Sequence, residues 1–216
     1  MIVAVDGTAA SGKGTLAKCL AKKLKLKHLD TGILYRIIGF EVYQNHNSGI
    51  NFEEKALMSA KDLNFSKLES FDTNTLKSDK VGEMASLIAK IPKIRFELIN
   101  FQREFTKFDS ELYNGAILDG RDIGSVILPN ANFKFFLDAK IEIRAKRRTQ
   151  ELIKLGYNTI FDDILNDIKN RDKRDKNRQI APLKKAKDAI YIDSSDFSVN
   201  EMLKIALNAI SGVKHY

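Results

Sequence analysis

A glycine-rich stretch near the start of the chain has the residue types and spacing that bind phosphate. Gly7 and Gly12 are separated by four residues, and Lys13 follows directly. Glycines let backbone N–H groups approach phosphate oxygens closely, and the lysine adds a mobile positive charge. An apolar run precedes the stretch and a helical pattern follows it, so the N–H groups of a helix start join the site. The predicted nucleotide-phosphate loop consists of Gly7, Thr8, Ala9, Ala10, Ser11, Gly12, Lys13, Gly14 and Thr15.

One position in this loop departs from the general phosphate-loop motif. Gly14 stands where that motif has the Ser or Thr whose hydroxyl reaches magnesium, and Thr15 follows one residue later. The hydroxyl contact is therefore not assured, and Thr15 is the candidate for it.

A second set of chemically useful residues follows the apolar run at 116–118. Asp119 stands at the end of this predicted strand, where phosphate-loop enzymes keep the acid that holds magnesium, often through water. Arg121 can offer a two-pronged contact to phosphate, and Asp122 can accept hydrogen bonds from an exocyclic amine. The alternative is a turn with a local ion pair.

Two further sets carry hydroxyl and guanidinium groups. Thr31, Tyr35 and Arg36 follow a short predicted strand and suit a second phosphate, although a capped helix with an exposed arginine would look the same. The basic run 171–178 follows a helix that carries Arg144 and Arg148. Arginines on a mobile segment can surround a moving phosphoryl group and exclude water, but such a run is also typical of a solvated helix face.

Short apolar strands alternate with helical patterns along the chain, which predicts a parallel sheet covered by helices on both faces. Strands are predicted at 2–5, 28–29, 116–118, 133–137 and 189–192, with further short strands at 63–65 and 75–76. Helices are predicted at 13–26, from 31 to 42, 92–108, 141–155, 161–172 and 199–210. In parallel sheets ligands bind at the carboxyl ends of the strands, which places Asp6, Asp30 and Asp119 at one edge beside the loop.

Composition limits the class of protein. The 216 residues are 44% hydrophobic, enough for one α/β core, and the net charge of +8 favours anionic partners such as nucleotides. Lysines scattered along helices account for much of this charge, so nucleic-acid binding is not the expected function. The single cysteine, Cys19, excludes an intramolecular disulfide and is expected to be partly buried. No long apolar segment or signal peptide is recognised, which predicts a cytoplasmic protein without a membrane span.

Several separated motifs in the right order resemble the bacterial cytidylate kinases, a family of nucleoside monophosphate kinases, and the resemblance runs nearly end to end. It rests on the loop with its order Gly-Lys-Gly-Thr, on the segments 29–36, 86–95 and 119–122, and on the run 171–183. The resemblance implies a P-loop NTPase-like fold: a parallel five-stranded sheet flanked by helices, with an insert that binds the nucleoside monophosphate and a helical lid. It implies a core at 1–36, 87–140 and 179–216, an insert at about 37–86, and a lid at about 141–178.

The same resemblance implies residue roles. The loop and Lys13 hold the ATP phosphates. The residues expected to bind CMP are Thr31, Tyr35, Arg36, Ser86, Arg95, Arg121, Asp122, Arg171, Asp175 and Arg178. Among them Ser86, Arg95 and Asp122 are expected to read the base, and Asp175 and Arg178 to meet the sugar. The groups expected to act on the phosphoryl group are Lys13, Arg121, Arg144, Arg148 and Arg174. Thr15 and Asp119 are the candidates for magnesium that arrives with ATP.

The implied reaction is direct in-line phosphoryl transfer from ATP to CMP, and to dCMP, by a monomer. Ala10 stands where the family often has Gly, which is tolerated if its φ is negative. The stretch between Arg36 and Ser86 is shorter than in long family members, which suggests a trimmed hairpin in the insert. His28, His46 and His215 have no metal-ligand spacing and no evident partners, so they are expected to be structural or exposed.

Two alternatives remain open at this point. The first is a kinase for another acceptor, UMP or AMP, although Leu16 argues against adenylate kinases, in which Gln usually follows the loop Thr. The second is a nucleotide-gated switch or an RNA-binding protein that uses the loop and the positive charge. The sequence contains no Asn-Lys-x-Asp motif for binding guanine and no evident group of aromatic residues on which bases could stack, so it does not support this alternative.

Overall fold

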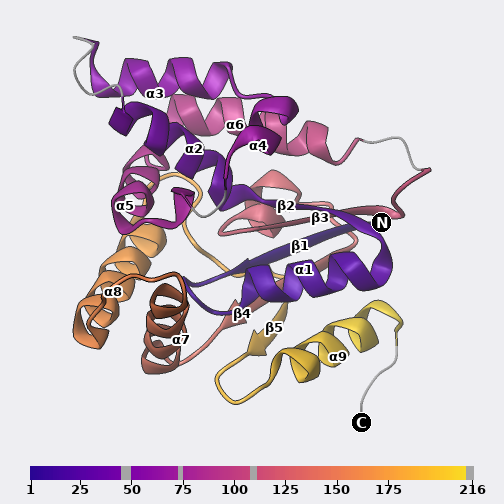
Figure 1. Cartoon of the computed structure of the whole chain (residues 1–216). Coiled ribbons are helices and arrows are strands. Elements are labelled where there is room, and N and C mark those ends of the chain that lie inside the picture. The colour runs from indigo at the N-terminus through magenta and orange to yellow at the C-terminus, as the bar shows by residue number, and fades with distance from the viewer. Residues whose placement is uncertain (45–49, 73–74, 108–110, 213–216) are drawn as a thin grey trace. The chain divides into compact units, whose positions relative to one another are not determined.

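The structure is a computed structural model that describes residues 1–44, 50–72, 75–107 and 111–212 (Figure 1). It contains two compact units, one formed by residues 1–29 and 109–216 and the other by residues 30–108. Each unit is described separately below.

The first unit is built on a five-stranded parallel sheet with the strand order β2-β3-β1-β4-β5. The strands are β1 (Ile2–Gly7), β2 (Leu26–Asp30), β3 (Gly115–Gly120), β4 (Phe133–Asp138) and β5 (Ile190–Asp193). β1 pairs in parallel with β3 and β4, so that Val5 lies opposite Asp119 and Gly7 opposite Leu137. The predicted fold class is therefore confirmed, and the ends of β1, β3 and β4 lie side by side.

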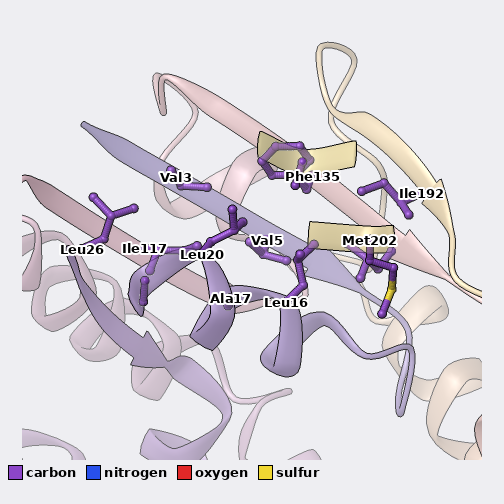
Figure 2. Packing of buried hydrophobic residues seen from close by; sticks show 13 residues of the cluster. Val3, Val5, Leu16, Ala17, Leu20, Leu26, Ile117, Phe135, Ile192 and Met202 are labelled. Carbon is purple, nitrogen blue, oxygen red and sulfur yellow. The ribbon is translucent and has the colours of Figure 1, made fainter. Parts of the chain in front are cut away.

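Helices α1 (Lys13–Leu24) and α9 (Val199–Ile210) pack on the sheet through one hydrophobic core. Figure 2 shows Leu16 and Leu20 of α1 among Val5 of β1 and Met202 of α9. α1 ends two residues earlier than predicted because Lys25 adopts a left-handed conformation (φ 53°), and the chain enters β2 at Leu26. β2 is correspondingly longer than the predicted strand at 28–29.

Helices α7 (Ile141–Lys154) and α8 (Phe161–Asn177) pack against each other around a second apolar cluster, which includes Ala145, Leu152, Ile164 and Ile168. The predicted end of α8 at residue 172 is wrong, because the helix continues through the basic run to Asn177. Asp172 and Asp175 are buried within this run, and buried residues there favour a regular helix over a loose loop.

The second unit is helical throughout its described residues. It contains α2 (Thr31–Gln44), α3 (Phe52–Lys61), α4 (Phe65–Ser70), a 3₁₀ turn at Thr75–Lys77, α5 (Asp79–Ile88) and α6 (Pro92–Phe105). The strands predicted at 63–65 and 75–76 are wrong, and the described residues of 37–86 hold no hairpin. The reason is local: Asn64 caps α4 by accepting from Lys67 N, and Ser78 caps α5 by accepting from Val81 N.

The predicted division into core, insert and lid concerns functional parts and stays a prediction, since the two compact units follow different boundaries. The last helix, predicted at 199–210, has these bounds in the structure. Cys19 is partly buried, as expected. In the described part of the chain, the helices are too short or too polar to cross a membrane.

Candidate functional site

The loop between β1 and α1 turns tightly against the end of β4. A Cβ added to Gly7 would lie 2.2 Å from the carbonyl oxygen of Leu137, so no side chain fits at that position. Gly12 has φ 87°, a left-handed conformation that favours glycine. Both glycines of the predicted motif are therefore required by backbone geometry, independently of any ligand.

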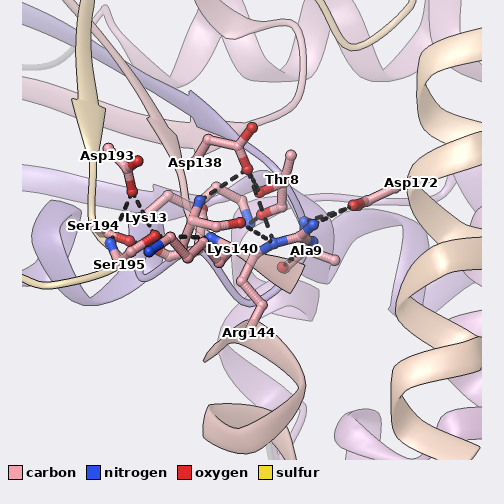
Figure 3. A network of polar contacts seen from close by, with 12 residues as sticks. Thr8, Ala9, Lys13, Asp138, Lys140, Arg144, Asp172, Asp193, Ser194 and Ser195 are labelled. Carbon is pink, nitrogen blue, oxygen red and sulfur yellow. Dashed lines mark hydrogen bonds and ion pairs between the residues drawn. The ribbon is translucent and has the colours of Figure 1, made fainter. Parts of the chain in front are cut away.

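The carbonyl groups of the loop are anchored by surrounding residues (Figure 3). Arg144 Nη1 donates to the Ala9 carbonyl at 3.1 Å, and Ser194 Oγ donates to the Ser11 carbonyl at 2.7 Å. Arg147 in turn donates to the hydroxyl and the carbonyl of Ser194. The N–H groups of Thr8, Ala9 and Ser11 donate to Leu137, Asp172 and Thr8. Because the carbonyls are bound outside the loop, the remaining N–H groups of the loop can turn toward a phosphate.

Lys13 and Thr8 have defined positions in this loop. Lys13 Nζ donates to the Thr8 carbonyl at 3.3 Å, and Thr8 Oγ1 donates to Asp138 Oδ1 at 2.7 Å. Asp138 ends β4, as Asp119 ends β3. The ammonium group of Lys13 therefore lies beside the loop backbone. In proteins with a phosphate loop, the lysine at this position contacts the outer phosphates of the nucleotide.

Ala10 has φ 57°, so the expectation of a negative φ is wrong. A left-handed conformation costs an alanine roughly 1 kcal/mol. Its side chain packs against the apolar cluster of α7 and α8. This contact gives the methyl group a role that glycine at this position could not provide.

Asp119 is buried at the end of β3 and lies beside the start of α1. A Cβ added to Gly14 would be 3.5 Å from Asp119 Oδ1, and Thr15 is exposed in the next position. Carboxylate and hydroxyl oxygens are suitable ligands for Mg²⁺, directly or through water. The described residues contain no cluster of three or more acidic, His or Cys side chains that could hold a resident metal.

His28 has a partner that the sequence did not reveal. Its Nε2 lies 2.8 Å from Asp119 Oδ2, because β2 and β3 are neighbours in the sheet. The contact occupies one carboxylate oxygen and orients the other. His46 and His215 lie outside the described residues.

The segment after β3 brings two predicted residues, Arg121 and Asp122, together with two more at the end of α8. Arg121 Nε donates to Asp175 Oδ2 at 2.8 Å, and Arg178 Nη2 donates to Asp122 Oδ1 at 3.1 Å. Burial would raise the pKa of Asp175, but the charges of Arg121 and Arg171 outweigh it and lower the pKa below its ordinary value. These two pairs form a compact charged cluster in the first unit.

The predicted phosphoryl-binding arginines of α7 and α8 differ in their surroundings. Arg144 is buried, with Nη2 2.7 Å from Asp172 Oδ2, whereas Arg148 pairs with Glu151 one helical turn away. Among the described residues no partner is found for the buried Nε of Arg174. Asp172 also accepts a long hydrogen bond from Ala9 N, at 3.4 Å. Arg144 and Asp172 thus connect the phosphate loop with both α7 and α8.

In the second unit, two of the predicted residues stack against each other. Arg95 is buried, and its guanidinium carbon lies 5.8 Å from the centre of the Tyr35 ring, a distance typical of a cation–π contact. Arg95 Nη1 also donates to the Ala89 carbonyl at 3.3 Å. Thr31 is buried at the first position of α2.

Arg36 and Ser86 are held between α2 and α5. Arg36 Nη1 donates to the carbonyls of Leu76 and Ser78, at 2.5 and 3.5 Å, and a Cβ on Gly82 would lie 3.1 Å from Arg36 Nη2. Ser86 Oγ donates to the Gly82 carbonyl at 3.0 Å. The guanidinium of Arg36 is therefore fixed rather than solvated, which disfavours the interpretation as an exposed arginine at a capped helix.

Sequence reasoning missed four polar residues of this region, namely His28, Asp138, Asp172 and Ser194. Asp138 could have been found by the rule that selected Asp119, since both end a buried strand. The contacts of the other three depend on the order of the strands and on the packing of α8, which no local pattern reveals.

Comparison with known proteins agrees with this geometry. The family model described as cytidylate kinase matches residues 3–212. The chain is similar to cytidylate kinases from Bradyrhizobium diazoefficiens, with 44% identity over 99% of this chain and 97% of that protein, and from Rhodopseudomonas palustris strain BisA53, with 44% identity over 99% and 98%. A crystal structure of an uncharacterized protein from Eubacterium ventriosum shares the fold, with a TM-score of 0.58 at 16% identity over 98% of both chains. The chain belongs to the cytidylate kinase family, as the sequence motifs indicated.

Proposed function

We propose that this protein transfers the terminal phosphoryl group of ATP to CMP, giving ADP and CDP. The observation that carries the proposal is the match to cytidylate kinases at 41–44% identity over nearly the full chain. A phosphate loop at the end of β1 and a charged cluster after β3 supply the groups that such a reaction needs. The protein is a phosphotransferase of the nucleoside monophosphate kinase class.

ATP is bound by the loop Gly7–Thr15, with its N–H groups and Lys13 on the phosphates. Thr15 and Asp119 would hold the magnesium ion that arrives with ATP, and the ion would supply positive charge against the phosphates. The anchored loop carbonyls and the position of Lys13 over Thr8 support this assignment.

CMP is bound through its phosphate by Arg36, Arg121, Arg171, Thr31 and Tyr35, and through its base by Ser86, Arg95 and Asp122. A carboxylate can accept from the N4 amine of cytosine, and a guanidinium can donate to its O2 and N3. Asp175 and Arg178 meet the sugar. Their pairing with Arg121 and Asp122 supports this, because the same cluster then orients groups for phosphate, sugar and base.

The transferring phosphoryl group is stabilised by Lys13, Arg121, Arg144, Arg148 and Arg174. Phosphoryl transfer needs positioning and charge neutralisation, so no covalent intermediate and no dedicated base is required. The buried Nε of Arg174 supports a role in binding an anion, since a buried donor is costly without an acceptor.

The proposal extends to dCMP as a second acceptor, to a monomeric protein and to a location in the cytoplasm. These points rest on the family resemblance, and gel filtration with purified protein tests the monomer.

A coupled assay of ADP release tests the reaction. The purified protein is mixed with Mg-ATP and, in separate reactions, CMP, dCMP, UMP, AMP, GMP or no acceptor. Strong turnover with CMP and dCMP and little with the others is expected. Turnover with UMP or AMP alone would be consistent with the proposed phosphate-binding residues but would show that Ser86, Arg95 and Asp122 do not select cytosine.

The net charge of +8 leaves one rival, an RNA-binding protein gated by nucleotide. Filter binding with tRNA at increasing salt separates the two. Tight binding that falls steeply with salt, together with absent CMP turnover, would favour the rival.

A further inference from the structure

Asp6 is a buried carboxyl group to which the proposed reaction assigns no role. It lies near the carboxyl end of β1, is 4% exposed, and is opposite Gly120 of β3 and Phe136 of β4. Both of its oxygens accept hydrogen bonds from consecutive backbone groups. Ile123 N donates to Oδ1 at 2.7 Å, and Gly124 N donates to Oδ2 at 2.8 Å.

We propose that Asp6 is a positioning residue for the acceptor: its ionised carboxylate fixes the turn that presents Arg121 and Asp122, so that the affinity for CMP follows the ionisation of Asp6. The inference rests on the proposed function, in which Arg121 and Asp122 bind CMP.

The turn that Asp6 holds begins directly after these two residues. Ile123–Ile127 forms a π-helical turn with Asp122 in the capping position. The first N–H groups of a helical turn have no acceptor within it. Asp6 supplies that acceptor from β1, and two bonds to successive N–H groups fix the backbone orientation on the carboxyl side of Asp122.

This arrangement assigns separate tasks to two neighbouring carboxylates. The Asp122 side chain makes no capping hydrogen bond, although aspartate is a favoured cap, and it accepts from Arg178 instead. Because Asp6 caps the turn, the carboxylate of Asp122 can be directed to Arg178. Removing the Asp6 contact would release this constraint on Asp122.

The packing around the turn leaves little room for rearrangement. A Cβ added to Gly124 would lie 3.4 Å from Asp6 Oδ2 and 3.1 Å from the Cδ of Lys134. The Lys134 stem therefore covers the turn, while its ammonium binds the Pro129 carbonyl and Asp188.

The charged groups that act on Asp6 are Asp122 and Arg121, directly before the turn, while the apolar stem of Lys134 on β4 lies against Gly124 of the turn. Burial, together with the negative charge of Asp122, raises the pKa of Asp6 to about 7. The two hydrogen bonds from N–H groups and the positive charge of Arg121 lower the pKa, but their effect is smaller. When Asp6 takes up a proton, one of its oxygens carries a hydrogen that faces the N–H group from which it accepted. Protonation therefore removes one of the two hydrogen bonds between Asp6 and the turn. The turn is thus expected to loosen as the pH falls below neutrality.

Steady-state kinetics of Asp6→Asn test the inference, with the intact protein and with Asp62→Asn as the control, because Asp62 carries an exposed carboxylate outside the site. Asn keeps one accepting oxygen and places an NH₂ group against the second N–H. At about pH 8, the KM for CMP should rise about tenfold, the equivalent of one hydrogen bond, while the KM for ATP changes less than about twofold.

The ratio of the variant's KM for CMP to that of the wild type should fall toward one between about pH 8 and about pH 6. The CMP phosphate titrates equally in both measurements and cancels in this ratio. Equal changes in both KM values, or a ratio that is one at every pH, would overturn the inference. Absent CMP turnover by the wild type would instead reject the proposed function.

A measurement on the wild type alone covers the case in which Asp6→Asn does not fold. The amide resonances of Ile123 and Gly124 should shift together with pH, with an apparent pKa near 7, in protein without nucleotide. Amide resonances that stay constant through neutral pH would overturn the link between ionisation and the turn.

Discussion

Lys13 is the side chain whose removal has the clearest expected effect. Its ammonium lies over the loop on the Thr8 carbonyl and is the only charge within the loop. Lys13→Ala should lower kcat for CMP phosphorylation by about two orders of magnitude or more, because charge developed on the phosphoryl group loses its partner. Circular dichroism should show an unchanged fold.

Lys18→Ala is the matched control for Lys13→Ala, since Lys18 is exposed on the same helix. It removes the same charge from α1 without touching the loop. If both variants lose the same activity, or if Lys13→Ala keeps the wild-type rate, the loop assignment is wrong.

Asp122 offers a test of base reading. Asp122→Ala removes the partner of Arg178 and the proposed acceptor for the cytosine amine. The KM for CMP should rise about tenfold or more, and the KM for ATP should change little. Equal effects on the two constants would mean that Asp122 only supports the structure.

The two long helices α7 and α8 depend on Arg144. Its guanidinium binds the Ala139 and Ala9 carbonyls and pairs with Asp172, all with little exposure. Arg144→Met leaves a buried carboxylate without its partner and should lower the free energy of unfolding by about 3 kcal/mol. Urea denaturation measures this loss.

Arg148→Met is the comparison for Arg144→Met, because Arg148 lies on the same helix but pairs with a half-exposed Glu151. It should cost less than about 1 kcal/mol. If Arg148→Met lowers the free energy of unfolding as much as Arg144→Met, the loss comes from replacing any arginine of α7. The buried ion pair between Arg144 and Asp172 then makes no particular contribution to stability.

Much of this arrangement could be predicted from the sequence. Alternating apolar strands and helices predicted the parallel sheet, and strand ends predicted Asp119 beside the loop. The helical unit was harder to predict from the sequence, because residues 63–65 and 75–76 include apolar residues typical of strands. In the structure, Asn64 and Ser78 instead cap the helices that follow them. The left-handed Ala10 could not be predicted, since the packing of α7 and α8 determines it.

The site residues divide in the same way. The loop with Lys13 was predicted from its spacing together with its place between an apolar strand and a helix, and the Asp119–Asp122 segment from its place at the end of a predicted strand. His28 and Asp172 reach their partners across about 90 and about 160 residues of chain. Asp6 was placed at the correct edge of the sheet, but its hydrogen bonds to Ile123 and Gly124 follow from the path of the chain after β3.

The stability of the protein as a whole should depend on pH through Asp6. Its folded pKa of about 7 exceeds the ordinary value of 3.8, so the folded state binds the proton more tightly. The free energy of unfolding therefore gains from Asp6 at low pH and loses this gain as the pH rises through 7. The lowered pKa of Asp175 acts oppositely, and its contribution is lost on acidification.

Urea denaturation of wild type and Asp6→Asn at several pH values separates these contributions. The wild-type advantage over the variant should shrink from about pH 4 to about pH 7 and then level off. A difference between the two proteins that is independent of pH would contradict the raised pKa.

The continuous helix α8 has a consequence for insertions and deletions in the chain. Arg171 and Asp175 lie four residues apart and share one face near the end of α8, and Arg178 follows at the residue that caps the helix end. One alanine inserted after Asn170 would rotate all later side chains by about 100° and displace the whole set together. An alanine inserted after Asn158, in the turn between α7 and α8, leaves that face intact. We expect CMP turnover to be lost in the first variant and retained in the second, so this part of the chain should tolerate changes of length only outside the helix.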